Sequence, residues 1–228
     1  MRYEIKGTPM PVVDVVLDKG ESMYTQSGGM CWMSPTVSME TNMKGGFMKG
    51  LGRIFSGETL FMVTYTAQQQ NDRIAFAASF PGEIHRLDLS GGKEYIVQKQ
   101  AFLCAEPSVT LSTYFQKKLS AGLFGGEGFI MQKISGSGSA FVELSGSIVE
   151  VELAANEQIK VDTSHVAYFE STCQYSVETV KGFKNILFGG EGLFLTVLTG
   201  PGKVYLQTMT AANFAEKIIP YIPVQSSN

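Results

Sequence analysis

Several features that would place this chain outside the cytoplasm are missing from its sequence. The first residues, MRYEIKGTPMPVVDVV, lack the basic and then apolar pattern of a signal peptide. No apolar run approaches the roughly 18 residues that a membrane span requires. The chain has three cysteines and no CxxC pair, and an odd number argues against a disulfide framework. We therefore expect a cytoplasmic protein without structural disulfides.

Signatures of catalysis are missing as well. The phosphate-binding patterns GxxxxGK(S/T) and GxGxxG do not occur, and neither do GxSxG or HExxH. With two histidines, a Cys–His or Ser–His pair is possible by number alone, but no spacing favours one. The sequence thus predicts no catalytic residues, no metal ligands and no cofactor, and we expect a protein that is not an enzyme.

What is present is typical of a folded, strand-rich protein. Hydrophobic residues make up 44% and charged residues 17% of the 228 residues, which excludes a disordered chain. The 25 glycines, together with abundant Ser, Thr and Gln, favour many short strands joined by tight turns. The net charge is −3, so nucleic-acid binding would need a local basic patch and is not expected.

A glycine-rich hexapeptide recurs along the chain. LFGGEG occurs at 123–128 and 187–192, and a degenerate copy, IFSGET, occupies 54–59. The phenylalanines of the three copies recur at intervals of 69 and 64 residues: Phe55, Phe124 and Phe188. Leucines upstream recur at intervals of 72 and 64 residues: Leu17, Leu89 and Leu153. Because five segments agree in the same order, we interpret the chain as three tandem repeats of about 12–80, 83–146 and 147–210.

The periodicity inside each repeat is that of β-strands. Val149, Val151 and Leu153 alternate with glutamates, which predicts one face in the core and one in water. The runs LFMV, FIM and LFLTVL are apolar on both faces and predict central strands. The dipeptides Gly91-Gly92 and Pro201-Gly202 predict hairpin turns.

We therefore predict an all-β protein whose three β-sandwich-like repeats form one compact, pseudo-threefold domain over residues 1–228. Helix is scarce. A short C-terminal helix is expected over 211–219, with Thr210 as a possible N-cap and Pro220 as its end. Helical turns are further possibilities around 43–53 and 116–123.

The repeats also test candidate sites, since a catalytic group is needed once whereas a framework residue recurs. The three cysteines fall in three different positions of the repeat, each apolar in the sister copies, so we interpret them as buried hydrophobic residues: Cys31, Cys104 and Cys173. His85 aligns with two valines, and His165 with a glycine and an alanine. We interpret both histidines as tolerated or hydrogen-bonded side chains.

Two recurring features leave a binding role open. One glutamate follows the glycines in every copy and either anchors a turn or belongs to a symmetric carboxylate site: Glu58, Glu127 and Glu191. Basic residues interleaved with apolar ones lie just upstream: Lys49, Arg53, Lys117, Lys118, Lys181 and Lys184. Such a pattern either packs as a solvated loop or contacts an anionic surface, a phospholipid interface or an RNA backbone.

The repeated FGGEG motif followed by an apolar strand, the threefold repeat and the length resemble the family named for altered inheritance of mitochondria. The resemblance spans about residues 3–220. It implies the fold of the tryptophan RNA-binding attenuation protein, a short relative of the double-stranded β-helix, in three copies per chain. It also implies a homotrimer, and mitochondrial relatives are associated with inner-membrane organisation and respiratory complexes. No catalytic residues are established for this family, and none carries over.

From these observations we expect a non-enzymatic oligomeric scaffold or interaction protein, with a membrane-peripheral location as one possibility. Its partners would be further copies of the chain, another protein or an anionic membrane surface. The alternative is a ring that binds nucleic acid or a small ligand. Against RNA, the basic positions drift between copies, because Arg53 aligns with Gly122 and Ile186.

Overall fold

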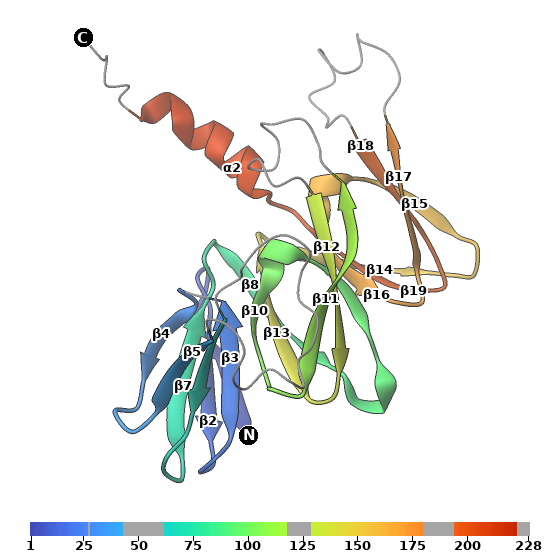
Figure 1. The fold of residues 1–228 in the computed structure, drawn as a ribbon. Coiled ribbons are helices and arrows are strands. Elements are labelled where there is room, and N and C mark those ends of the chain that lie inside the picture. The colour runs from blue at the N-terminus through green and yellow to red at the C-terminus, as the bar shows by residue number, and fades with distance from the viewer. Residues whose placement is uncertain (27, 43–61, 118–128, 180–193, 223–228) are drawn as a thin grey trace.

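A computed structural model describes residues 1–26, 28–42, 62–117, 129–179 and 194–222 (Figure 1). Four antiparallel sheets account for most of them. The first has the order β1 (Arg2–Lys6), β2 (Val12–Leu17), β7 (Asp72–Ala77), β4 (Met30–Met33). The second has the order β5 (Ser38–Asn42), β6 (Met62–Thr66), β3 (Ser22–Gln26), β10 (Phe102–Ala105), β13 (Ser139–Ser145), β8 (Gly82–Asp88).

The third sheet has the order β11 (Val109–Lys117), β12 (Phe129–Gly136), β9 (Tyr95–Gln98), β16 (Val166–Glu170), β19 (Gly202–Gln207), β14 (Ile148–Leu153). The fourth has the order β15 (Gln158–Asp162), β18 (Phe194–Thr199), β17 (Gln174–Thr179). Short 3-10 turns connect some strands: η1 (Ser90–Gly92), η2 (Lys99–Ala101) and η3 (Thr163–His165). A fourth, η4 (Ile219–Tyr221), follows the last strand. The prediction of a mostly β protein is therefore confirmed.

One order of pairing recurs three times along the chain. Apart from β1, the strands form three consecutive groups of six, β2–β7, β8–β13 and β14–β19. In each group the first strand pairs with the sixth and the sixth with the third, as in β2–β7–β4, β8–β13–β10 and β14–β19–β16. The second pairs with the fifth and the fifth with the fourth, as in β3–β6–β5. The fifth strands β6, β12 and β18 are central, as their apolar runs predicted.

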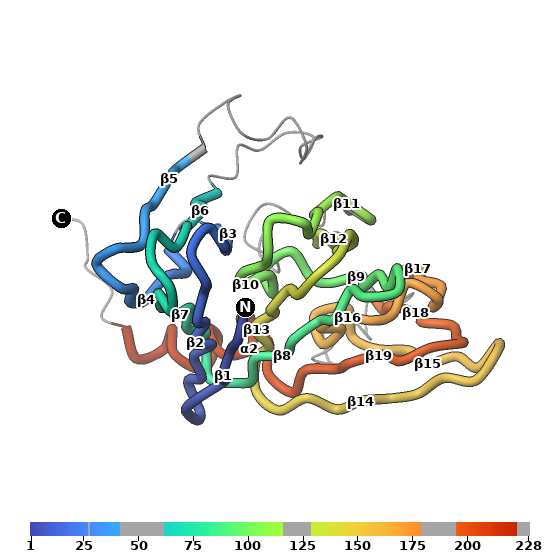
Figure 2. The backbone as a smooth tube through the Cα atoms, turned by 90° about the horizontal axis from the view of Figure 1, so that it is seen from below, coloured from blue at the N-terminus to red at the C-terminus, as the bar shows by residue number. Residues whose placement is uncertain are grey.

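Neighbouring groups share sheets because a strand of one group extends a sheet of the next. β3 of the first group pairs with β10 of the second, and β9 of the second pairs with β16 of the third. Figure 2 shows the groups following one another across the molecule, with β4 near one end and β15 near the other. The chain is thus an open row of groups joined by main-chain hydrogen bonds.

Apolar side chains on the inner faces fill three core clusters, one for each stretch of this row. Each cluster is built around aliphatic residues of the paired strands. The first also contains the fully buried Phe76 of β7, and the third contains the fully buried Phe169 of β16. The middle cluster mixes residues of several groups, such as Tyr24, Phe102 and Tyr168. The junctions between groups are therefore packed as well as hydrogen-bonded.

The expected hairpins at two glycine dipeptides are wrong. Gly91 lies in η1 between β8 and β9, and Pro201-Gly202 joins β18 to β19. Both turns link strands of different sheets, because the strands on either side pair elsewhere. A turn signal in sequence marks a change of direction and does not identify which strand becomes the partner.

The C-terminal helix is confirmed as α2 (Ala211–Ile218), followed by η4. Thr210 caps it, because its side chain accepts a hydrogen bond from the Asn213 amide at 3.0 Å. In Figure 1 this helix extends away from the sheets. In the part of the chain that the structure describes, no helix is long and apolar enough to cross a membrane.

Candidate functional site

Most residues proposed from the sequence as binding residues lie outside the described part of the chain. These are Glu58, Glu127, Glu191, Lys49, Arg53, Lys118, Lys181 and Lys184. The helical turns considered around 43–53 and 116–123 fall almost entirely on the same segments. Of the proposed binding residues, Lys117 is the exception, because its backbone is described. It is the last residue of β11 and pairs with Phe129, the first residue of β12. The choice between a turn anchor and a carboxylate site stays a prediction.

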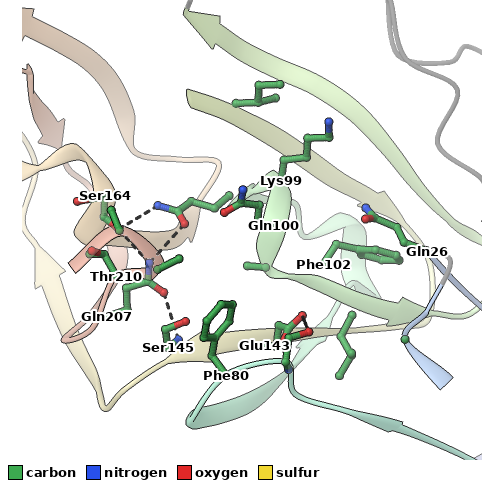
Figure 3. A pocket seen from close by; sticks show the side chains of 18 of the residues that line it. Gln26, Phe80, Lys99, Gln100, Phe102, Glu143, Ser145, Ser164, Gln207 and Thr210 are labelled. Carbon is green, nitrogen blue, oxygen red and sulfur yellow. Dashed lines mark hydrogen bonds between the residues drawn. The ribbon is translucent and has the colours of Figure 1, made fainter. Parts of the chain in front are cut away.

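A cavity of about 680 Å³ opens between the strands and the first turns of α2. Its walls come from all three groups of strands, and Figure 3 shows the polar residues that line it. The lining includes Gln26 of β3, Phe129 of β12 and Gln207 of β19, and Ala211 and Ala215 of α2 close one side. The cavity therefore exists only once the three groups and the helix have assembled.

Gln207 holds one wall of this cavity in place. Its side-chain oxygen accepts from the Ser145 amide at 3.2 Å, and its nitrogen donates to the Ser164 carbonyl at 2.9 Å and to Gln98 at 3.4 Å (Figure 3). The His165 ring also hydrogen-bonds the Gln207 carbonyl at 2.7 Å. Both groups of Gln207 are satisfied by the protein, so this residue serves the framework.

Glu143 is the carboxylate of the cavity wall (Figure 3). It accepts hydrogen bonds from the Ser79 amide and, at 3.2 Å, from the Ser79 hydroxyl. Burial raises the pKa of Glu143, because a charged carboxylate is poorly solvated there, and the two hydrogen bonds oppose that shift. A half-buried acid held by one serine is able to accept a hydrogen bond from a polar ligand.

The α2 segment and the following η4 carry exposed apolar side chains beside this cavity. Every residue of α2 and η4 is exposed except the half-buried Ala212, and the exposed fraction reaches 62% for Ile219 and 85% for Tyr221. Phe214 makes an edge-to-face contact with Phe80, with ring centroids 6.0 Å apart. Phe214 and Ile218 are four residues apart and share one face of the helix. The four-residue spacing of Phe214 and Ile218 is visible in the sequence, whereas the cavity depends on the fold.

The expectation that all three cysteines are buried is wrong for one of them. Cys104 and Cys173 are buried, but Cys31 is exposed. Cys31 lies in β4, an outer strand of the first sheet, where Trp32 is also 50% exposed. Their counterparts lie in β10 and β16, which have a strand on both sides. Position at a sheet edge, which the repeat alignment did not reveal, decides the exposure.

His85 is hydrogen-bonded, as one of the two sequence interpretations held. Its Nδ1 lies 2.9 Å from the Tyr168 hydroxyl, and its Nε2 lies 3.2 Å from Glu83. Among the described residues, no three histidine, cysteine or acidic side chains lie close enough together to hold a metal ion. The contacts of His85 connect two sheets, since β8 and β16 belong to different ones.

Comparisons with known proteins identify a matching family and two similar bacterial proteins. A family model described as "Mitochondrial biogenesis AIM24" matches residues 3–209. An uncharacterized protein of Streptococcus pyogenes serotype M6 is 30% identical over 237 residues, which cover 100% of this chain and 93% of the relative. The crystal structure of a Streptococcus pyogenes protein superposes with a TM-score of 0.78 at 26% identity, covering 97% of this chain and 99% of that one.

Proposed function

This chain belongs to the mitochondrial biogenesis AIM24 family, and we propose that it is a non-enzymatic oligomeric scaffold that attaches peripherally to an anionic membrane surface. Its three groups of strands are tandem repeats of one unit, arranged like the tryptophan RNA-binding attenuation protein with pseudo-threefold symmetry. The recurrence of one pairing order in β2–β7, β8–β13 and β14–β19 supports the tandem repeats. Three copies of the chain form the assembly, and its location is cytoplasmic.

The observation that carries the membrane proposal is the exposure of α2. A helix of eight residues is too short to be stable alone in water, where about 12–15 residues are marginal. Nevertheless α2 leaves Phe214 and Ile218 exposed on one face and continues into exposed Tyr221 and Ile222. An amphipathic helix with aromatic residues on its apolar face lies in the boundary between lipid head groups and acyl chains. A bilayer would bury the face that the strands leave open.

Positive charge near α2 supports an anionic surface. Phe129 lines the same cavity as the first turns of α2, and the backbone of Lys117 pairs with Phe129. The backbone position of Lys117 therefore places one basic residue at this end of the molecule. α2 itself adds Lys217 beside Glu216 and contributes no net charge. Each lysine near an anionic bilayer contributes about 1 kcal/mol to attachment.

Vesicle cosedimentation tests this proposal. We expect the protein to sediment with vesicles of phosphatidylcholine and phosphatidylserine at low salt, and more weakly with pure phosphatidylcholine. Replacing Phe214 and Ile218 by serine should weaken binding at least about tenfold, because each buried apolar side chain contributes roughly 1.5–3 kcal/mol. Replacing Met39 by serine is the control, because this residue is 55% exposed on the outer strand β5.

The charge contribution is tested separately with Lys117→Glu. This variant should bind the phosphatidylserine vesicles roughly thirtyfold more weakly, because reversing one charge changes the attachment energy by about 2 kcal/mol. Its binding to pure phosphatidylcholine should be unchanged. If the wild-type protein does not sediment with anionic vesicles at low salt, the membrane proposal is wrong. Equal binding by the α2 variant and the wild type would show that another surface makes the contact.

A second candidate function, binding of a small polar ligand, is favoured by the cavity beside α2. Its wall offers the Glu143 carboxylate next to the ring of Phe80. A fragment screen by saturation-transfer NMR, repeated with Glu143→Gln and Phe80→Ala, tests it. Ligands of this cavity should lose their signal in both variants, and fragments that bind all three proteins equally would count against it.

A further inference from the structure

The two junctions between groups of strands share one register. At the first junction Cys104 of β10 lies opposite Thr25 of β3, and at the second Tyr168 of β16 lies opposite Val97 of β9. Cys104 and Tyr168 are both fifteen residues after Leu89 and Leu153, and Thr25 and Val97 are both eight residues after Leu17 and Leu89. Equivalent positions therefore meet at both junctions.

The same rule leaves one strand open at each end of the row. The third strand of the first group, β4, pairs with β7 alone, and the second strand of the third group, β15, pairs with β18 alone, among the residues that the structure describes. β4 corresponds to β10 and β16, and β15 corresponds to β3 and β9. Because β4 and β15 lie at opposite ends of the molecule (Figures 1 and 2), they do not meet within one chain.

The pairing of β4 with β7 has the same irregularity as the equivalent pairings of β10 and β16. β4 bonds β7 with a register shift between Met30 and Trp32. The same shift occurs between Phe102 and Cys104 in β10 and between Val166 and Tyr168 in β16. An identical bulge orients the outer edge of all three strands alike. The edge of β4 is thus shaped to receive a strand in the way that β10 receives β3.

Side chains of β4 are more exposed than those at the equivalent positions of β10 and β16, which have a strand on both sides. Trp32 occupies the position of Cys104 and Tyr168, which are 0% and 3% exposed, yet Trp32 is 50% exposed. Met33 is half-buried at the position of the fully buried Ala105 and Phe169. A large apolar side chain on an open strand edge is costly in water and marks a surface that pairs.

We propose that β15 of one copy pairs antiparallel with β4 of the next copy, so that the chains assemble head to tail. Applying the internal register places Trp32 opposite Val161 and Met33 opposite Lys160 of the neighbouring copy. The interface is heterologous, because two different edges meet, and rotation about a common axis closes it into a ring in which the edges of β4 and β15 are both paired. This inference rests on the oligomeric part of the proposed function and names the surface that forms the oligomer.

Lys160 is compatible with this contact. It stands at the position of Tyr24 and Ile96, and its ammonium group forms an ion pair with Glu178 of β17 at 2.7 Å. The charge is therefore held across β18 toward β17 of its own sheet, while the aliphatic stem is available to Met33 of the next copy. Charged residues also protect unpaired edges, so Lys160 slows non-specific pairing while the register-matched edge is absent.

Disulfide trapping between differently tagged copies tests the register. In a Cys31→Ser background, one copy carries Met33→Cys and the other carries Lys160→Cys. Both positions are exposed or half-buried, so folding should survive the changes. After mild oxidation with oxidised glutathione we expect a linked heterodimer in the mixture and several-fold less linkage in either copy alone. The control mixture replaces Met33→Cys by Met39→Cys, an exposed position on the outer strand β5.

The oligomeric state of the wild-type protein decides how a failure of the disulfide trapping is interpreted. Light scattering should report an oligomer, and Trp32→Glu should convert it to a monomer while Met39→Glu does not. An oligomer that gives no linked product above the control would overturn the head-to-tail register and leave the scaffold proposal standing. A wild-type monomer would overturn both, and vesicle binding through α2 would still be tested independently.

The fluorescence of Trp32 provides a second test of this interface that requires no disulfide. Trp32 is the single tryptophan of the chain, so its fluorescence reports β4 alone. Assembly should move its emission to shorter wavelength as the protein concentration rises, because pairing with β15 removes water from the indole. Emission that stays constant while light scattering shows association would place the interface elsewhere and contradict the inference.

Discussion

Nδ1 of His85 and the hydroxyl of Tyr168 lie 2.9 Å apart, which connects the outermost strand of one six-stranded sheet to an inner strand of the next. Tyr168 is 3% exposed and stacks on Tyr205 with ring centroids 4.1 Å apart. Burial raises the pKa of the Tyr168 hydroxyl, so the phenol stays neutral and hydrogen-bonded. The pair fixes how the second and third groups of strands sit against each other.

Tyr168→Phe should lower the free energy of unfolding by about 1 kcal/mol, because the ring packing is kept and one buried hydrogen bond is lost. Urea denaturation of this variant, of His85→Phe and of the double variant gives the coupling between the two residues. We expect a coupling of about 1 kcal/mol. A coupling near zero would show that the hydrogen bond adds nothing to the contact between the sheets.

The buried carboxylate of Asp14 is paired with Lys6 and Arg73, and this makes the stability of the fold depend on pH in acid. Asp14 is 4% exposed and accepts hydrogen bonds from Lys6 at 2.9 Å and from the Arg73 guanidinium. Burial acts to raise the pKa of Asp14, but the hydrogen bonds and charges of Arg73 and Lys6 outweigh it, so the pKa lies below its ordinary value. The stabilisation is therefore present above the unfolded pKa of about 3.9 and is lost as the pH falls through the folded pKa.

Asp14→Asn should cost about 2 kcal/mol at pH 7, because it removes the charge from a buried, paired carboxylate. The difference between wild type and variant should shrink as the pH falls below the unfolded pKa and through the lowered folded pKa, because the wild-type carboxyl then takes up its proton. Urea denaturation at a series of pH values measures this. Glu4→Gln, which removes an exposed partner of Lys6, should change stability by less than about 0.5 kcal/mol. A constant difference at all pH values would contradict the account.

Gly82 opens β8 where two backbones nearly touch. A Cβ atom at this position would lie 1.8 Å from the Leu144 carbonyl oxygen, and the Gly82 amide donates to the Pro9 carbonyl at 2.7 Å. Gly82→Ala should therefore destabilise the fold by about 3 kcal/mol or more, because β8 and β13 have to separate. Gly20→Ala is the comparison: at φ +90° it meets no described atom within 4 Å, and should cost only about 1 kcal/mol. Thermal unfolding distinguishes the two, and equal losses would contradict the steric argument.

Gln132 is fully buried in β12, and neither its side-chain nitrogen nor its oxygen has a hydrogen-bond partner among the described residues. It faces Val97 of β9 at the position that Val63 and Thr196 occupy in the other groups. Gln132→Val should raise the free energy of unfolding by about 1 kcal/mol or more, since a buried unpaired amide is costly. Gln98→Val should instead lower it, because Gln98 donates to the Ser164 carbonyl at 3.1 Å. A loss of stability in Gln132→Val would mean that its amide is satisfied.

Local sequence patterns predicted the elements well, since they depend only on neighbouring residues. The C-terminal helix was predicted from Thr210 as its N-cap and Pro220 as its end, and α2 begins at Ala211 as expected. The apolar runs predicted the central strands, each of which has a neighbouring strand on both sides. The family was predicted from the FGGEG motif, and the comparisons confirm it.

The same patterns failed wherever exposure depends on a distant strand. Val149 was expected to face the core by alternation, yet it is 49% exposed because β14 is the outermost strand of its sheet. Cys31 was expected to be buried and is exposed for the same reason. The cavity beside α2 joins Gln26, Phe129 and Gln207, which no spacing in the sequence connects.

The sequence by itself determined the strands, their threefold recurrence in pattern and the short capped helix, because hydrophobic periodicity and capping act over a few residues. Only the tertiary structure decided which strand pairs with which, because main-chain hydrogen bonds carry no side-chain signature. It is this pairing that leaves β4 and β15 open at opposite ends. It also leaves Trp32 exposed where Cys104 and Tyr168, at the equivalent positions, are buried.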